Sequence, residues 1–122
     1  MAAGDLASLK KYDSAIVAMH TAGTTVRFAL ASGNVMTFTI SGAASAKLCH
    51  INPNNLSALW TDNTYIYLGY KDGRLYRITI ADPDGAETQL AKFDCAINAI
   101  AITGTTLYVA LADGHLYSYA LA

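Results

Sequence analysis

Residues 9–41 read LKKYDSAIVAMHTAGTTVRFALASGNVMTFTIS, and a related pattern, LAKFDCAINAIAITGTTLYVALADGHLYSYALA, returns 81 positions later at 90–122. The two segments align without a gap, and 13 of their 33 positions are identical. A further copy lies between them, because DGRLY at 72–76 stands 41 residues before DGHLY at 113–117. Three copies at a period of 40–41 residues predict a repeat protein.

The third copy shows the strand pattern within one repeat. Residues 96–102, AINAIAI, form a short run rich in isoleucine, which predicts a strand buried on both faces. Residues 107–112, LYVALA, alternate between two faces, as a half-buried strand does. The pair Asp113-Gly114 predicts a hairpin turn into 115–121, HLYSYAL, which alternates again. Because no segment shows helical periodicity with caps, we predict an all-β chain.

Each connection between copies supplies a fourth strand. The first holds AKLCHI at 46–51 and the second holds TQLAKF at 88–93. Four-stranded units with this period are typical of β-propeller blades. By the same alignment of the repeats, LASLKKY at 6–12 is predicted to be the fourth strand of a blade, and it precedes the first complete blade in the sequence.

The predicted organisation is one unit over 1–122 that contains three blades. We expect these blades at 15–51, 56–93 and 96–122, with the outer strand missing from the third. The strand at 6–12 and the incomplete blade are expected to belong together, so that an N-terminal strand completes a blade that a C-terminus begins. Such closure removes an exposed strand edge, which otherwise invites aggregation.

In the order of its elements the repeat resembles the WD-repeat propeller family. Residues 97–103, 107–111, Asp113-Gly114 and 116–119 follow the family's order of strand, strand, Asp-Gly turn and strand. The family's Gly-His pair is missing from all three copies, and other propeller families share a similar period. The family's closing Trp-Asp pair is replaced by Phe38-Thr39, Ile78-Thr79 and Tyr119-Ala120. The resemblance implies a propeller fold and, by default, protein–protein interaction.

Three blades are fewer than the four to eight of usual closed propellers. A monomer would expose apolar blade faces larger than soluble proteins tolerate. Identical chains commonly close by point-group symmetry, so two chains give six blades and three give nine. We expect a six-bladed homodimer, with a homotrimer as the other closed solution. The remaining alternative is a fragment, or an engineered half, of a longer propeller.

The charge, the hydrophobic fraction and the cysteines limit the classes of function that we expect for this chain. The net charge of −1 gives no indication of the basic surface that binds nucleic acid. The hydrophobic fraction of 53% is high for 122 residues and predicts burial between β layers or against another chain. No apolar run reaches the roughly 18–20 residues that span a bilayer. The N-terminus has no apolar signal core, and Cys49 and Cys95 occupy unrelated repeat positions, which favours a reducing, cytoplasmic setting.

Motifs for catalysis, cofactors or metals are not found in the sequence. His20, His50 and His115 occupy three different repeat positions and form no symmetric ligand set within the chain. Asp72 and Asp113 each precede a glycine at a predicted hairpin, which gives both a structural reason. We therefore expect a non-enzymatic protein without cofactor or metal.

Candidate contacts for a protein or peptide partner lie where the repeat departs from itself. Trp60 has His20 and Ala101 as counterparts, so the blade does not require an indole there. Arg74 and His115 vary beside a fixed glycine at a hairpin tip, and loop tips commonly carry binding residues. The candidates are Trp60, Tyr70, Asp72, Arg74, Asp113 and His115.

A propeller that binds a small ligand or glycan is the second class of function. Symmetric pockets between blades would need an aromatic side chain with a polar partner in every copy. Tyr67 and Tyr108 occupy equivalent positions in copies two and three, but Arg27 stands there in the first. This difference favours protein interaction over ligand binding.

Overall fold

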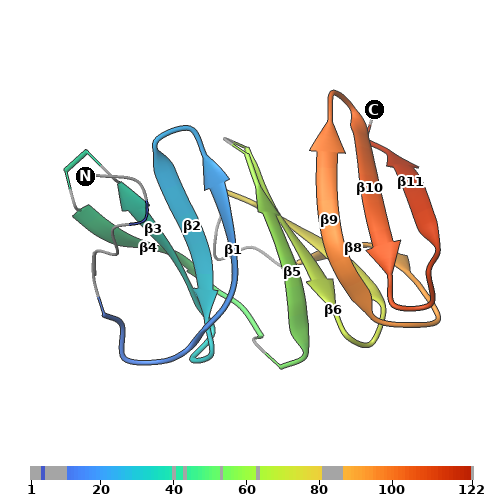
Figure 1. The fold of residues 1–122 in the computed structure, drawn as a ribbon, viewed down its shortest axis with the longest axis horizontal. Coiled ribbons are helices and arrows are strands. Elements are labelled where there is room, and N and C mark those ends of the chain that lie inside the picture. Colours follow the sequence, from blue (N-terminus) through green and yellow to red (C-terminus); the bar gives the residue numbers. More distant parts are fainter. Residues whose placement is uncertain are drawn as a thin grey trace.

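The computed structural model describes residues 4, 11–39, 41–42, 44–52, 54–62, 64–80 and 87–121. These residues form three antiparallel sheets that lie side by side (Figure 1). Blade 1 contains β1 (Ile16–Ala22), β2 (Thr25–Leu30), β3 (Asn34–Thr39) and β4 (Ala44–His50). Blade 2 contains β5 (Leu56–Thr61), β6 (Tyr65–Tyr70), β7 (Arg74–Thr79) and β8 (Thr88–Lys92). Blade 3 contains β9 (Ile97–Thr103), β10 (Thr106–Leu111) and β11 (Leu116–Ala120).

Each blade is a meander in which every strand pairs with the next strand along the chain. The first strands of the three blades, β1, β5 and β9, lie next to one another (Figure 1). This arrangement confirms the predicted all-β fold of propeller blades. Residues 6–10 of the strand predicted at 6–12 lie outside the described residues.

Turn chemistry defines the second hairpin of each blade. Gly73 and Gly114 have φ values of +92° and +94°, which glycine adopts without the steric cost that other residues incur. The carboxylate of Asp72 accepts a hydrogen bond from the Arg74 backbone N–H at 3.1 Å, and Asp113 accepts one from His115 at 3.0 Å. Both aspartates therefore have the structural role that the Asp-Gly pairs predict.

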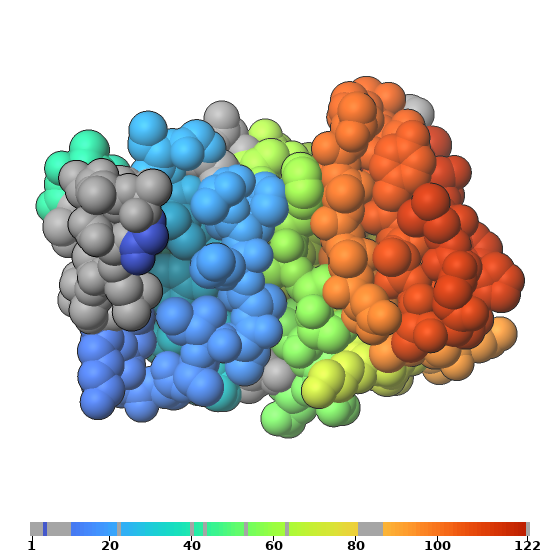
Figure 2. Space-filling view, in the orientation of Figure 1, coloured from blue at the N-terminus to red at the C-terminus, as the bar shows by residue number. Residues whose placement is uncertain are grey.

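The core lies between the blades. Between blades 2 and 3, Tyr67 and Leu75 pack with Ile97, Leu107 and Val109. Gly69 lies on β6 at this interface, where an added Cβ would come within 2.7 Å of the Ile97 side chain. A similar cluster joins blades 1 and 2, and a third, smaller cluster of Phe28, Leu30 and Phe38 lies within blade 1 with Tyr12 packed against it. Figure 2 shows one face of the molecule, on which the three blades follow one another in a row.

Two details differ from the sequence-based expectations. The strand β9 is not buried on both faces, because Asn98, Ala99 and Ala101 are exposed. The strand β5 is also the first of its sheet but is well buried, because blade 3 packs against blade 2, whereas no described residue covers the corresponding face of blade 3. The fourth strand of blade 1 was predicted at 46–51, whereas β4 spans Ala44–His50.

The two cysteines lie in different parts of the fold and do not form a disulfide. Cys49 is buried in the cluster between blades 1 and 2, and Cys95 is half-buried in the connection to β9. No helix long and apolar enough to cross a membrane occurs within the described segments.

Candidate functional site

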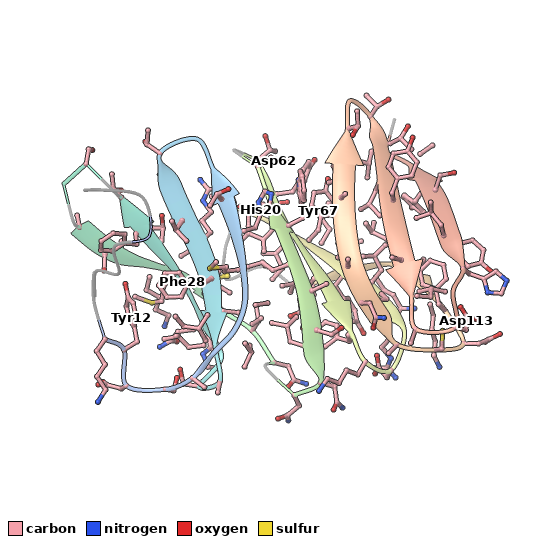
Figure 3. The ribbon with its side chains drawn as sticks, in the orientation of Figure 1. Tyr12, His20, Phe28, Asp62, Tyr67 and Asp113 are labelled. Atoms are coloured by element: carbon pink, nitrogen blue, oxygen red, sulfur yellow. The ribbon has the colours of Figure 1, made fainter. Side chains whose placement is uncertain are left out.

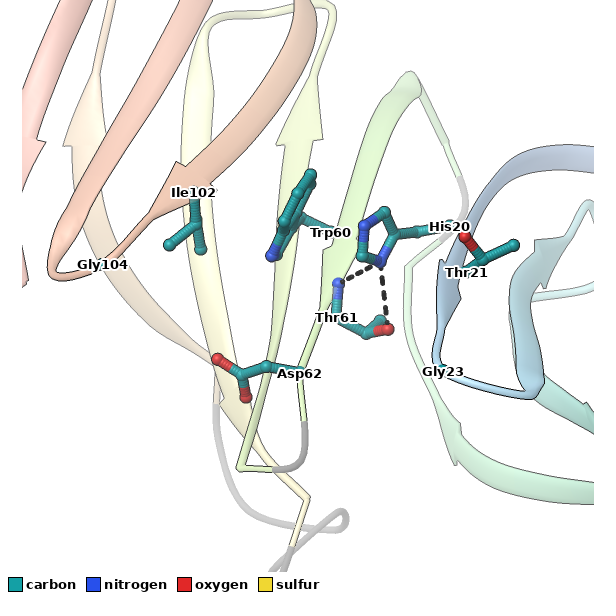
Figure 4. Close-up of a pocket in the computed structure, with 8 residues that line it drawn as sticks. All are labelled: His20, Thr21, Gly23, Trp60, Thr61, Asp62, Ile102 and Gly104. Carbon is teal, nitrogen blue, oxygen red and sulfur yellow. Dashed lines mark hydrogen bonds between the residues drawn. The ribbon is translucent and has the colours of Figure 1, made fainter.

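Trp60 borders a hollow of about 710 Å³ where the ends of the three blades meet (Figure 4). The strands β1 and β5, and the end of β9 with its following turn, supply its walls, so residues some forty positions apart come together. The lining residues are His20, Thr21, Gly23, Trp60, Thr61, Asp62, Ile102 and Gly104. The hollow is therefore a product of the repeat and not of one continuous segment.

His20 forms one side of the hollow by stacking on Trp60. The two ring centroids are 3.9 Å apart, with an interplanar angle of 34°. The His20 Nδ1 atom accepts a hydrogen bond from the Thr61 backbone N–H at 3.1 Å, so the neutral ring carries its proton on Nε2. Burial lowers the pKa of His20, and the nearby Arg27 guanidinium lowers it further. His20 is thus held as a neutral ring with a hydrogen-bond donor at Nε2.

Asp62 is fixed by the turn that follows β5. Its Oδ1 atom accepts hydrogen bonds from the backbone N–H groups of Thr64 and Tyr65, both at 2.7 Å. The Arg27 guanidinium donates to the backbone oxygen of Asp62 and so ties blade 1 to blade 2. The hollow combines a stacking surface with hydrogen-bonding groups, which suits binding of another molecule more than acid–base chemistry.

Three of the sequence candidates, Tyr70, Asp72 and Arg74, come together at a second place. They border a polar cavity of about 140 Å³ beside the β6–β7 hairpin. The Tyr70 hydroxyl donates a hydrogen bond to the backbone oxygen of Asn52 at 3.1 Å. Arg74 Nε lies 3.5 Å from Asp72 Oδ2. The remaining lining residues are Asn52, Asn54, Asn55, Tyr76 and Glu87.

Asp113 and His115 lie in the equivalent place beside the β10–β11 hairpin. His115 Nδ1 is 2.9 Å from Asp113 Oδ2, and the His115 ring stacks on Tyr117. The hydrogen bond from the His115 backbone N–H lowers the pKa of Asp113. A cavity of about 250 Å³ adjoins this hairpin.

The six sequence candidates therefore occupy three separate places. Figure 3 shows His20 and Asp62, which border the Trp60 hollow, near one edge of the blades and Asp113 near the opposite edge. The described residues contain no group of three or more side chains that could hold a metal ion. Sequence reasoning placed no functional weight on His20 and did not consider Glu87, because a single repeat copy does not reveal which neighbours face them.

The open face of blade 3 is a further surface that the sequence candidates did not include. We define it by Ala99, Tyr108 and Leu116. Tyr67 of blade 2 is 2% exposed, whereas its repeat equivalent Tyr108 is 39% exposed. Leu75 is fully buried, whereas its equivalent Leu116 is 71% exposed. Blade 3 covers these positions in blade 2, but no described residue covers them in blade 3.

The open face of blade 1, defined by Ile16 and Met19, shows the same contrast at the other end, while Val26 beside it packs against the cluster of Phe28, Leu30 and Phe38. Ile97 of blade 3 is fully buried, and its equivalent Ile16 is 52% exposed. Ile100 is 8% exposed, and its equivalent Met19 is 65% exposed. Both faces could have been predicted from the aligned repeat, because the terminal copies carry apolar residues at the same positions as the copies that meet between blades 2 and 3.

No protein-family model and no curated protein matches the chain. Among solved structures it is similar to the computationally designed Ika4 protein, with a TM-score of 0.61 and 13% identity, over 99% of this chain and 100% of that one. It is also similar to the computationally designed Ika8 protein, with a TM-score of 0.56 and 13% identity, over 93% of this chain and 48% of that one.

Two natural proteins show the same likeness. BamB from Moraxella catarrhalis gives a TM-score of 0.61 and 20% identity, over 84% of this chain and 30% of that one. A chain of the Mitotic Checkpoint Complex gives a TM-score of 0.67 and 12% identity, over 87% of this chain and 33% of that one. The chain thus spans all of Ika4, about half of Ika8 and about a third of the other two. These propeller-type neighbours agree with the fold of the three blades.

Proposed function

We propose that this chain is a non-enzymatic β-propeller scaffold for protein interaction, and that two copies close one ring by head-to-tail association. The observation that carries the proposal is the contrast in exposure between repeat-equivalent residues. The open face of blade 3 carries the residues that blade 2 presents to blade 3. The open face of blade 1 carries the repeat equivalents of the blade 3 residues that pack against blade 2. Each face is therefore the natural cover of the other.

The size of the ring follows from the number of blades. Two copies give six blades, which lies within the usual range of four to eight, whereas three copies give nine. A head-to-tail contact repeats one interface and closes by rotation, as cyclic symmetry requires. Closure would bury the apolar side chains of both open faces, and such burial is the main driving force of association.

We further propose that the segment 6–12 of one copy completes blade 3 of the other. In blade 2, Phe93 donates its backbone N–H to the Gly73 oxygen at 2.8 Å, and an added Gly73 Cβ would lie 2.1 Å from the Phe93 oxygen. In blade 3 no described residue donates to the Gly114 oxygen, and an added Cβ there would meet nothing within 4 Å. Tyr12 is the repeat equivalent of Phe93, so its segment is the matching cover.

Partner binding is assigned to the loops of the assembled ring. The Trp60 hollow and the two hairpin cavities are the proposed contact places, since surface loops on a rigid scaffold commonly carry binding residues. The proposed contact residues remain Trp60, Tyr70, Asp72, Arg74, Asp113 and His115.

Light scattering tests the assembly directly. We expect a solution mass of twice 12.9 kDa at micromolar concentration. Leu116→Asp and Met19→Asp each place a charge on one open face, and each variant is expected to be monomeric. Val17→Asp is the matched control, because Val17 is also exposed and its repeat equivalents Ser57 and Asn98 are polar, so its mass should stay that of the dimer.

Mixing the two monomeric variants gives a more specific test of the head-to-tail contact. Leu116→Asp keeps an intact blade 1 face and Met19→Asp keeps an intact blade 3 face, so the mixture can form one junction and should contain a heterodimer. Deleting residues 1–11 should abolish the ring. A monomeric wild-type chain would contradict the proposal, and would favour a piece of a longer propeller whose other blades cover both faces.

A further inference from the structure

The polar cavity beside the β6–β7 hairpin departs from the repeat in three ways. The connection into blade 2, at 51–55, has one residue more than the connection at 93–96. Asn55 adopts a left-handed backbone with φ of +67°, the one positive φ among the described residues other than glycine. Tyr70 stands where the other blades have leucine. These departures give blade 2 a cavity chemistry that its neighbours lack.

Two tyrosine rings form one wall of this cavity. Tyr70 and Tyr76 meet edge to face, with ring centroids 5.5 Å apart and an interplanar angle of 87°. Tyr70 is almost fully buried, and its hydroxyl donates to the Asn52 backbone oxygen, so the hydroxyl oxygen keeps lone pairs that can accept. The faces of aromatic rings attract cations.

The charges of the cavity do not cancel. Arg74 is paired with Asp72, which leaves the Glu87 carboxylate without an ion-pair partner among the described residues. Burial raises the pKa of Glu87, because the ionised carboxylate is partly removed from water without a compensating positive charge. A cationic group in the cavity would supply that charge. Asn54 and Asn55 add side-chain oxygens that can accept hydrogen bonds, and Asn52 Oδ1 already accepts one from the Asn54 backbone N–H at 3.0 Å.

The equivalent cavity of blade 3 lacks this combination. Leu111 stands in the place of Tyr70, and Lys92 brings a positive charge to a lining that also carries the carboxylates of Asp94 and Asp113. No glutamate or asparagine borders that cavity. It therefore serves as an internal comparison for the chemistry of the cavity in blade 2.

We propose that the cavity in blade 2 binds a primary ammonium group, such as that of a lysine side chain or of a free alkylamine. Glu87 acts as its counter-ion, and Tyr70 and Tyr76 form the aromatic wall. An ammonium is a compact charge with three donors, which matches the small volume and the several acceptors better than a planar guanidinium does. This inference does not depend on how many copies form the ring.

Calorimetric or NMR titration with Nα-acetyl-lysine methylamide, n-butylamine and Nα-acetyl-norleucine methylamide tests the site. We expect both amines to bind and the neutral norleucine compound not to bind. Glu87→Gln should weaken amine binding about tenfold or more, because it removes the charged acceptor. Tyr70→Leu introduces the residue that blades 1 and 3 tolerate, and it should also weaken binding.

Asp13→Asn is the control, since it changes an exposed carboxylate that borders neither hairpin cavity and should leave amine affinity unchanged. Repeating the titration on the Leu116→Asp variant separates this site from assembly. Amine binding that survives Glu87→Gln, or equal binding of the norleucine compound, would overturn the proposal. If the lysine compound binds more tightly than n-butylamine, a protein lysine is the favoured source; if both bind equally, a free amine suffices, and both results support the site.

Discussion

At the scale of single residues, Gly73 and Gly114 form a natural matched pair. Both have a positive φ in the same turn, but only Gly73 has chain packed over its α-carbon. The difference between them arises from what covers each blade and not from local turn geometry. Replacing each glycine by alanine therefore separates backbone strain from coverage.

We predict that Gly73→Ala destabilises the fold much more than Gly114→Ala does when both are measured in a monomeric background such as Leu116→Asp. Both substitutions are expected to lower the free energy of unfolding by about 1–2 kcal/mol, because alanine is strained in the left-handed backbone conformation. Only Gly73→Ala adds an overlap, since its Cβ would lie 2.1 Å from the Phe93 oxygen. Urea unfolding measures the difference. Equal losses for the two variants would show that the turn is not covered as described.

His20 is expected to make stability depend on pH. Its folded pKa is lowered below 6.5 by burial and by Arg27, so its contribution is present above pH 6.5 and is lost as the pH falls through the lowered value. We predict that the free energy of unfolding decreases from about pH 7.5 to about pH 5.5. His20→Gln should reduce this slope. An unchanged slope in His20→Gln would contradict the burial of His20 beside Arg27 as the cause of the pH dependence.

At the scale of elements, β7 and β11 are repeat equivalents with different surroundings. The strand β7 pairs with β6 and β8, whereas β11 pairs only with β10 among the described strands. An unpaired strand edge exposes hydrogen-bonding groups and can pair with another chain. The pairing of β7 with β8 gives the register for such a partner, because Arg77 lies opposite Thr88.

We predict a specific cross-link between copies. Shifting the Arg77–Thr88 pair by the repeat places Ser118 of one copy opposite Ala7 of the other. Mixing Ser118→Cys with Ala7→Cys, both in a Cys95→Ser background, should give an oxidised heterodimer on a non-reducing gel. Ser8→Cys is the control, because adjacent strand residues face opposite sides of a sheet. Association without the Ala7 cross-link would retain the ring but exclude this register.

At the scale of the whole molecule, stability is predicted to depend on protein concentration. The core lies between blades, so the terminal blades each have one covered face and one open face. Association that involves only folded chains stabilises the fold by mass action. We expect the thermal midpoint of the wild type to rise with concentration, and that of Leu116→Asp to stay constant. A concentration-independent wild type would contradict the dimer.

Sequence reasoning predicted the parts of the fold that depend on neighbouring residues. The Asp113-Gly114 turn and the alternation of β10 follow from local chemistry, and the structure confirms both. The burial of β9 on both faces was predicted wrongly, because an apolar run does not reveal whether another blade packs against the sheet, as blade 3 does against β5. The candidate Trp60 was found as a departure from the repeat, but its stack with His20 needed two blades to be placed side by side.

The sequence by itself determined the period, the strands, the hairpin turns and the number of blades, because backbone preference and side-chain alternation depend on residues close in the chain. Only the tertiary structure decided which copies of the same apolar residue are buried. Leu75 and Leu116 have the same local sequence pattern and opposite exposure, since burial depends on what packs against a blade. The same reason applies to Glu87. Only the tertiary structure places its carboxylate in one cavity with Tyr70 and the asparagines of another segment.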